Sequence, residues 1–344
     1  MAFLSVIIAA HNAEATLHAT LSSLLAATDQ DTEIIIFNDS SEDATQAIID
    51  EWSPKFPQII TRTVNFRNVG RVRNSAVALA SGEYITMLDS DDCLKPGSLR
   101  DAMAYLKAQR PDMLLTRLLE IRDPRRMTSD WQGFKPVPLS QHEAIARFLR
   151  HKDFQAHLIG QFIHRSLYEK NPIPPMLCYE DFAVFPGMLM QSSKIAYQRQ
   201  GHYYYIKRRD SLSSSLDASK ISTLVECTLQ MERTFPSRYK HLVNCHWFDI
   251  YSNHRSCLTD QQLQLVKQRV KTMYTLSFFL SNDVRFSYKK GLLRRYGKNK
   301  TTAISTDDRF KPHLLDTGFS QFWEAKRIFL YRYLRQYYWP GFRI

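Results

Sequence analysis

Four short apolar runs alternate with three segments of helical periodicity near the start of the chain. The apolar runs are residues 3–9, Glu33–Phe37, Ile59–Val64 and Tyr84–Leu88, and the helical segments are Ala13–Ala27, Ser41–Trp52 and Val69–Ala80. Strands covered on both faces are apolar along most of their length, and parallel strands need a crossover segment between them. The alternation therefore predicts an α/β fold, with a mostly parallel sheet and helices on both of its faces.

Polar side chains follow three of these four runs, at the point where each predicted strand ends. His11, Asn12 and Glu14 follow the first run, Asn38, Asp39, Ser40, Ser41 and Asp43 the second, and Asp89, Ser90, Asp91 and Asp92 the fourth. Open parallel sheets bind ligands outside the carboxyl ends of their strands. We therefore expect these side chains to gather at one edge of the sheet and form a binding site.

The acidic segment Asp89–Asp92 is the strongest chemical signal in the chain. Unpaired carboxylates are costly to bury, whereas their oxygens suit a divalent cation that bridges phosphates. An acidic surface turn is the alternative interpretation, and it is the usual one for an isolated D-x-D. The polar clusters after the other strands favour the cation site.

Composition limits the size and compartment of the protein. The chain has 344 residues, of which 44% are hydrophobic, enough for one large domain or two smaller ones. No basic segment or cleavage site precedes the first run, and no stretch approaches about 18 apolar residues, so we expect neither export nor a transmembrane helix. The five cysteines lack metal-binding spacing and fit reduced thiols in the cytoplasm.

The rest of the chain is less regular. Asp112–Ile121 predicts a strand, Asp123–Pro138 a loop and Ser140–Arg150 a short helix, and the pattern becomes helical after residue 217. We therefore divide the chain into a sheet domain, residues 1–216, and a mainly helical, basic region, residues 217–344.

Several segments together resemble the family 2 glycosyltransferases, nucleotide-sugar enzymes of the GT-A fold. They are residues 5–14 (SVIIAAHNAE), 34–43 (IIIFNDSSED), 68–74 (NVGRVRN), 80–85 (ASGEYI) and 89–97 (DSDDCLKPG), in the family's order. Beyond residue 100 the resemblance returns at Glu180-Asp181, similar to the family's E-D pair, and at residues 203–211. The chain departs from the family at Ala10 and His11, where Pro and Tyr are usual, and at Ser40, where Gly is usual.

This resemblance implies a Rossmann-like GT-A domain that transfers a sugar, with inversion, from a nucleotide sugar to a hydroxyl group. The acceptor would be a bacterial surface glycan: lipopolysaccharide, capsule or wall polymer. UDP is the nucleotide that the family most often uses, and Mn²⁺ or Mg²⁺ is the expected cofactor. Asp181 would be the catalytic base, which takes the proton of the attacking hydroxyl, and Glu180 would support it or touch the acceptor.

The resemblance also assigns residues to the donor site. Asp91 is the expected metal ligand, with Asp89 close to the metal or the ribose, and His202 is a candidate contact to the metal or a phosphate. The residues expected around the donor are Ala10, Asn12, Glu14, Asp39, Asp43, Arg71, Arg73, Asp89, Ser90, Arg208, Arg209 and Ser211. The last three belong to a basic segment that would close over the diphosphate.

Each assignment has a structural alternative. Asp39 would instead cap the helix that begins near Ser41, and Asp43 and Glu14 would be ordinary acids of a first helical turn. Arg71 and Arg73 would form surface salt bridges, which contribute little to stability. The basic segment after residue 206 would be a solvated loop, and His202 a structural histidine.

Nearly all of the net positive charge lies at the end of the chain. Residues 285–344 hold 14 Lys/Arg and 4 Asp/Glu, a net charge of +10 out of +12 for the whole chain. Phe322–Arg335 has the pattern of an amphipathic basic helix, and Trp339 follows it. We expect it to dock on the anionic cytoplasmic face of the inner membrane, near a lipid-linked acceptor. A helix packed on the protein's own core or at a homo-oligomer interface is the alternative.

Other functional classes fit less well. A nicotinamide-dependent oxidoreductase would need G-x-G-x-x-G after the first strand, where the chain has His11-Asn12-Ala13-Glu14. A nucleic-acid or polyanion binder would account for the basic tail but not for the convergent carboxylates, so we expect no nucleic-acid partner. A catalytically inactive GT-A-like protein that binds nucleotides or polyanions is the remaining alternative.

Overall fold

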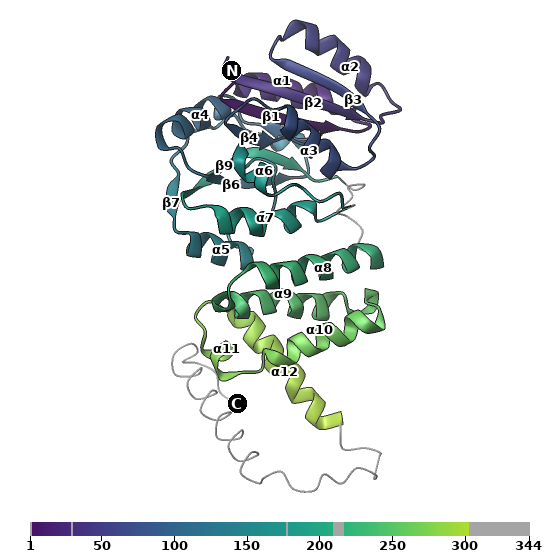
Figure 1. The fold of residues 1–344 in the computed structure, drawn as a ribbon, viewed down its shortest axis with the longest axis vertical. Helices are drawn as coiled ribbons and strands as arrows, with labels where there is room; N and C mark the ends of the chain where they lie inside the picture. Colours follow the sequence, from purple (N-terminus) through teal and green to yellow (C-terminus); the bar gives the residue numbers. More distant parts are fainter. Residues whose placement is uncertain (1, 29, 177, 209–216, 303–344) are drawn as a thin grey trace. The chain divides into compact units, whose positions relative to one another are not determined.

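The structure of the protein is a computed structural model that describes residues 2–28, 30–176, 178–208 and 217–302 (Figure 1). Residues Met1–Lys290 form one compact unit, and Gly291–Ile344 form a second. The predicted amphipathic helix Phe322–Arg335 lies outside the described residues. Among the helices of the described part, none is both long enough and apolar enough to span a bilayer.

A nine-stranded mixed sheet forms the centre of the first unit. The strands are β1 Leu4–Ala10, β2 Thr32–Asp39, β3 Ile59–Val64, β4 Tyr84–Met87, β5 Cys93–Leu94, β6 Met113–Ile121, β7 Val137–Leu139, β8 Phe162–His164 and β9 Ile195–Ile206. Their order is β3-β2-β1-β4-β8-β6-β9-β5, and β7 pairs with β9. The first four strands are parallel, as predicted. The second half is mixed, because β8 runs antiparallel to β4 and β6, whereas β9 runs parallel to β6.

Helices lie on both faces of the sheet, which confirms the predicted α/β class (Figure 1). They are α1 Leu17–Ala27, α2 Thr45–Trp52, α3 Val69–Leu79, α4 Ser98–Gln109, α5 Gln141–Leu149, α6 Arg165–Lys170, α7 Glu180–Gln191, α8 Ala218–Thr234, α9 Lys240–Asn253, α10 Asp260–Thr272, α11 Leu276–Leu280 and α12 Phe286–Thr302. Short 3₁₀ turns occupy Ser53–Lys55, Pro124–Arg126, Ser237–Tyr239 and Arg255–Cys257.

The helical pattern predicted after residue 217 corresponds to α8 and the helices after it. Met231 of α8 and Leu242 of α9 are buried in the same hydrophobic core as the sheet. Helices of this region therefore pack within the first compact unit, and a functional division after residue 216 stays a prediction.

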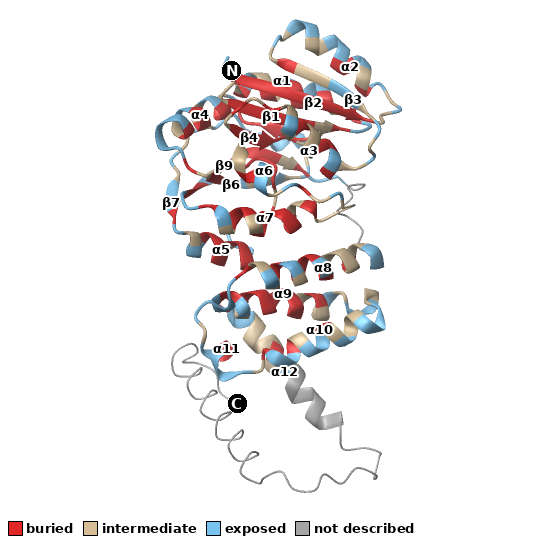
Figure 2. Cartoon of the chain, in the orientation of Figure 1, coloured by how far each residue is buried: buried red, intermediate tan, exposed pale blue. Residues whose placement is uncertain are grey.

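Burial explains why the strands can hold a site in place. β1 and β2 are buried along nearly their whole length, and side chains such as Val6 and Ile34 are fully buried (Figure 2). Burying one such side chain contributes roughly 1.5–3 kcal/mol to folding. Only the ends of these two strands are therefore accessible to a ligand. The loops at their carboxyl ends are anchored to a tightly packed sheet.

Candidate active site

The acidic loop after β4 brings three carboxylates together. Oxygen atoms of Asp89, Asp91 and Asp92 lie within 4.8 Å of one another. Backbone bonds fix the loop, since the N–H of Asp92 donates to the carbonyl of Asp89 (3.1 Å) and the hydroxyls of Thr16 and Thr20 donate to the carbonyl of Ser90 (2.9 and 3.0 Å). The loop is therefore held against α1 with its acidic side chains grouped.

The three acids have different surroundings. Asp92 is fully buried and accepts hydrogen bonds from the Tyr203 hydroxyl (2.6 Å) and the Ile206 N–H (2.7 Å), so it ties the loop to β9. Burial, and then the charge of Asp89, raise the pKa of Asp91, although Arg208 opposes this from 3.6 Å. Burial and Asp89 also raise the pKa of Asp92. The nearby arginines therefore do not fully offset the burial and mutual repulsion of these acids.

The acidic group fits a divalent cation. Hard cations bind carboxylate oxygens, and a cation would offset both the burial and the mutual repulsion that raise the pKa of Asp91 and Asp92. Asp92 already accepts two hydrogen bonds inside the protein, whereas Asp89 and Asp91 are only half-buried. Asp91 and Asp89 are therefore the residues that would hold the cation.

Arg73 connects this loop to the predicted catalytic acids. The guanidinium, on the buried side of α3, donates to Asp89 Oδ1 (3.1 Å) and to Glu180 Oε1 (2.7 Å). Burial opposes its charge, yet Asp89 and Glu180 raise the pKa of Arg73 well above its ordinary value. The D-x-D segment and the E-D pair therefore share one buried cation, and Arg73 is not the surface salt bridge of the alternative interpretation.

We expect Arg73→Met to destabilise the protein by about 3 kcal/mol, because removal of one partner leaves buried carboxylates without a counter-charge. Urea denaturation followed by circular dichroism measures the change. Arg71→Met is the matched control, since Arg71 is exposed on the same helix. Equal unfolding free energies for the two variants would contradict a structural role of Arg73.

Glu180 and Asp181 begin α7, after Tyr179 in a left-handed conformation (φ 62°). Glu180 is directed to Arg73, and burial together with Asp181 raises the pKa of Glu180. Asp181 is more accessible, with a side chain that is 25% exposed, and its Oδ1 accepts the N–H of Phe182 (2.8 Å). Asp181 is thus the carboxylate of the pair with an oxygen left to meet a substrate.

His157 is a site residue that the sequence did not indicate. Its Nδ1 lies 3.6 Å from Asp181 Oδ2. Burial lowers the pKa of His157, but the hydrogen bond and charge of Asp181 outweigh burial and raise the pKa above its ordinary value. The residue comes from the irregular segment between α5 and β8, where no periodic pattern marks a functional position.

This pair predicts a pH dependence. Below the folded pKa of His157 the imidazolium holds Asp181 in an ion pair; above it the proton is lost and Asp181 is released. The catalytic rate should therefore rise with pH through that pKa, which lies above the ordinary value of about 6.5. In His157→Gln this acidic limb should move to lower pH. Profiles of kcat/KM from about pH 5 to about pH 9 measure the shift, and superimposable profiles would contradict it.

Asp39 holds a backbone turn. Its carboxylate accepts the N–H groups of Phe66 (2.7 Å), Arg67 (2.9 Å) and Asn68 (3.0 Å), in the turn before α3. Burial opposes the charge, but these bonds lower the pKa of Asp39. The alternative interpretation, a cap on the helix after Ser41, is wrong, because the carboxylate binds a different segment. Any contact with a nucleobase or ribose would add to these bonds.

A second network joins the loops after β1 and β2. The Asn12 side chain accepts the N–H of Glu42 (2.9 Å), Glu14 accepts that of Ala44 (3.0 Å), and Asp43 accepts that of Glu14 (3.0 Å). These side chains therefore position the two loops, and their contact with a donor remains a prediction.

The other predicted donor residues lie as follows. Ala10 is buried at the end of β1, Arg71 is exposed on α3, and Arg208 follows β9 beside Asp91. Arg209 and Ser211 lie outside the described residues.

His202 does not reach the acidic group. It is fully buried on β9, with its ring against Phe162 (5.3 Å between centroids) and Phe134 (5.5 Å), and burial lowers its pKa to about 3. Alternation along the strand is the reason: Tyr203 faces Asp92, so its neighbour faces the other way. The prediction of a metal or phosphate contact is therefore wrong, and the structural alternative holds.

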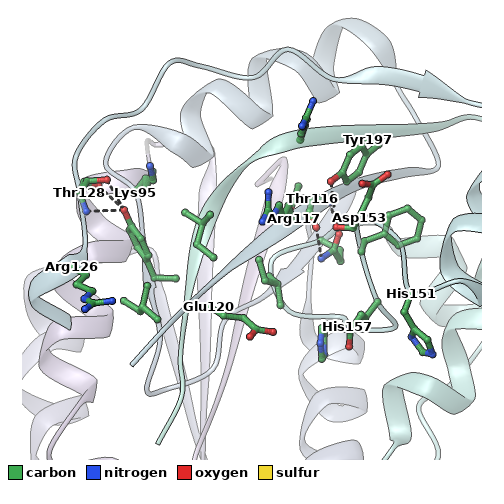
Figure 3. Close-up of a pocket in the computed structure, with 18 of the residues that line it drawn as sticks. Lys95, Thr116, Arg117, Glu120, Arg126, Thr128, His151, Asp153, His157 and Tyr197 are labelled. Atoms are coloured by element: carbon green, nitrogen blue, oxygen red, sulfur yellow. Dashed lines mark hydrogen bonds between the residues drawn. The ribbon is translucent and has the colours of Figure 1, made fainter. Parts of the chain in front are cut away.

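Two cavities meet at His157. The larger, of about 790 Å³, lies over β6 and β9 and is lined by Arg117, Glu120, Tyr197 and His157 among others (Figure 3). The smaller, of about 250 Å³, contains Asp181 and is lined by residues of α7, α8 and α9. His157 lines both. The predicted base therefore lies next to a cavity large enough for several sugar units.

Comparison with known proteins shows which family and which structures this chain resembles. The family model described as Glycosyl transferase family 2 matches residues 5–170. The chain is 25% identical over 319 residues to a poly(ribitol-phosphate) β-glucosyltransferase of Bacillus spizizenii, which covers 82% of this chain but only 49% of that protein.

Two solved structures share the fold. The structure of S. aureus TarS 1–349 in complex with UDP-GlcNAc has a TM-score of 0.58 at 17% identity, over 86% of this chain and 80% of that one. The mannosyltransferase PcManGT of Pyrobaculum calidifontis, in complex with GDP-Man and Mn²⁺, has a TM-score of 0.54 at 13% identity, over 95% and 84%. The chain is therefore similar to glycosyl transferase family 2 over residues 5–170, the part that contains the acidic loop.

Proposed function

We propose that the protein is an inverting, metal-dependent glycosyltransferase that moves a sugar from a nucleotide sugar, a UDP-sugar first of all, to a hydroxyl of a bacterial surface glycan. The observation that carries this proposal is Arg73, which joins Asp89 of the acidic loop to Glu180 of the E-D pair. The acids suited to the donor and the acids suited to the acceptor thus belong to one ion-pair network.

In the proposed reaction an acceptor hydroxyl attacks the anomeric carbon from the side opposite the nucleotide. The bond between that carbon and the phosphate oxygen breaks, and the nucleoside diphosphate leaves with its electron pair. Asp181 takes the proton of the hydroxyl, and its partly exposed side chain at the smaller cavity suits this role. Attack opposite the leaving group inverts the anomeric centre.

Asp91 and Asp89 are the residues that would hold Mn²⁺ or Mg²⁺. When bound, the cation neutralises charge that develops on the diphosphate. Arg208, 3.6 Å from Asp91, adds a second positive charge at the same edge of the sheet. PcManGT, whose structure contains Mn²⁺ with GDP-Man, has a similar fold and supports this proposal.

The partners are inferred from charge and from relatives. The B. spizizenii relative is named for a poly(ribitol-phosphate) acceptor and S. aureus TarS was solved with UDP-GlcNAc, which favours a UDP-sugar donor and a wall or surface glycan, free or lipid-linked. The net charge of +10 over residues 285–344 supports peripheral association with the anionic cytoplasmic face of the inner membrane. Homo-oligomer contacts are the alternative.

The test is donor turnover by the purified full chain. UDP-glucose, UDP-GlcNAc, UDP-galactose and GDP-mannose are each incubated with Mn²⁺, with Mg²⁺ or with EDTA, and release of nucleotide is measured. We expect the protein to hydrolyse one donor slowly, and we expect EDTA to abolish this hydrolysis. If no donor binds or turns over with either metal, the catalytically inactive, polyanion-binding alternative replaces this proposal.

A further inference from the structure

Two arginines follow the point where the pairing of β6 and β9 breaks. The strands run parallel in register up to Thr116 and Gln198, and the register then jumps to Leu118 and Tyr203. Arg117 and Arg199 are the next residues along the two strands after the last regular pair. Both are exposed and both line the cavity of about 790 Å³.

The charges of this cavity do not balance. Each of its acids has a cation nearby: Asp130 pairs with Lys95 (2.7 Å), Asp153 with Arg147 (3.0 Å) and Glu120 with Lys207 (2.6 Å). Among the residues that the structure describes, Arg117, Arg126 and Arg199 have no carboxylate within ion-pair distance. The cavity therefore has excess positive charge.

This excess has a cost in the free protein. Arg117 and Arg199 carry like charges in one cavity, and in the described part of the chain neither forms an ion pair that would offset their repulsion. An arginine binds phosphate or carboxylate through two parallel hydrogen bonds, so each of the two could bind an anionic group in the cavity. The arrangement suits an anion that enters the cavity.

We infer that this cavity binds anionic groups of the acceptor glycan, phosphodiester or carboxylate. The inference rests on the proposed function, because it concerns the acceptor of the same site. His157, which pairs with Asp181, also lines the cavity, so an acceptor held here has a path to the predicted base.

The cavity has room for more than one anionic group. Arg117 lies beside Thr116 and Tyr197 on one side, whereas Arg126 lies near Lys95 and Thr128 on the other (Figure 3). A glycan with a charge on each repeating unit would meet cations at both positions. A neutral glycan would leave both positions without a counter-charge.

Binding of oligomers tests the inference. The probes are a ribitol-phosphate oligomer, a galacturonic acid oligomer and a neutral dextran oligomer of similar length, at constant ionic strength. We expect the wild type to bind at least one charged oligomer about tenfold or more tightly than dextran, and the two charged probes identify phosphate or carboxylate as the group. In Arg117→Gln/Arg199→Gln this preference should fall by about tenfold or more, toward equal binding of the charged oligomer and dextran, since a hydrogen bond to a charged group contributes about that much.

The control is Arg62→Gln/Arg233→Gln, which removes two exposed arginines of β3 and α8 that do not line the cavity. It should bind like the wild type, and both double variants should keep the thermal unfolding midpoint. Equal binding of dextran and the charged probes, or equal losses in the two double variants, would overturn the inference. Metal-dependent donor hydrolysis is measured in parallel without acceptor: its absence in the wild type refutes the proposed function, whereas its presence with no charge preference refutes the anionic site alone.

Discussion

Replacing Asp181 by asparagine should lower the rate of sugar transfer by about 10²–10⁴-fold, the usual contribution of a general base. Asparagine keeps the shape of the side chain, and its amide oxygen can still accept the N–H of Phe182 that Asp181 accepts at 2.8 Å. It cannot take a proton from the acceptor hydroxyl. Donor affinity should stay within about threefold of the wild-type value, because the Asp181 side chain lines the smaller cavity and is not part of the acidic loop.

The measurement separates the two effects. Transfer is followed with saturating donor and a varied acceptor, and donor affinity by isothermal titration in the presence of Mn²⁺. Asp50→Asn, an exposed aspartate of α2, is the control and should behave like the wild type. If Asp181→Asn retains full transfer activity, another residue is the base.

Replacing Asp91 by asparagine should reduce metal-dependent turnover of the donor by at least about 100-fold, since metal stabilisation of transition-state charge contributes several kcal/mol. One charge is lost where the acids lie within 4.8 Å of one another, so the affinity for Mn²⁺ should fall as well. Stability should change little or rise, because burial and Asp89 disfavour the ionised form of Asp91.

Asp92→Asn gives the contrast. Asp92 accepts hydrogen bonds from Tyr203 (2.6 Å) and Ile206 (2.7 Å) on its two different oxygens. Asparagine keeps only one acceptor oxygen, so this variant should lose stability by about 1–3 kcal/mol while keeping more of its metal affinity. Mn²⁺ titration and urea denaturation of both variants make the comparison. Equal loss of Mn²⁺ affinity in the two variants would remove the distinction between a cation ligand and a loop anchor.

The first half of the fold could be predicted because its signals are local. Buried parallel strands such as β1 and β2 are apolar along most of their length, and each is followed by a helix with one apolar face. The strand at Asp112–Ile121 and the helix at Ser140–Arg150 were also predicted correctly, the latter with Ser140 accepting the Glu143 N–H (3.1 Å) as a helix cap.

The remaining strands carry weaker signals. β8 has three residues and β5 has two, too few for a period to appear. β9 is interrupted where its register with β6 jumps, so its pattern does not repeat. His202 was misassigned for this reason: without the strand and its alternation, the sequence does not show that Tyr203 faces Asp92 and that its neighbour faces the aromatic core.

The candidate site also has a part that the sequence predicts and a part that only the fold brings together. The acidic loop could be found because its residues are contiguous and follow a strand. Arg73 is among the residues that the sequence predicts around the donor, but its bonds to Asp89 and Glu180 depend on how α3 and α7 pack. His157 lies in an irregular segment, and only the folded chain brings it to Asp181.

The shared guanidinium of Arg73 has a consequence for how this site can change by mutation. A substitution at Asp89 removes one of the two ion pairs of the Arg73 guanidinium and so alters the charge around Glu180. A substitution at Glu180 likewise alters the charge around Asp89. Effects at the two acids should therefore not add, although they belong to separate motifs. A lineage that lost Arg73 would retain both carboxylates only by acquiring a new counter-ion, so the three positions should evolve as a single unit.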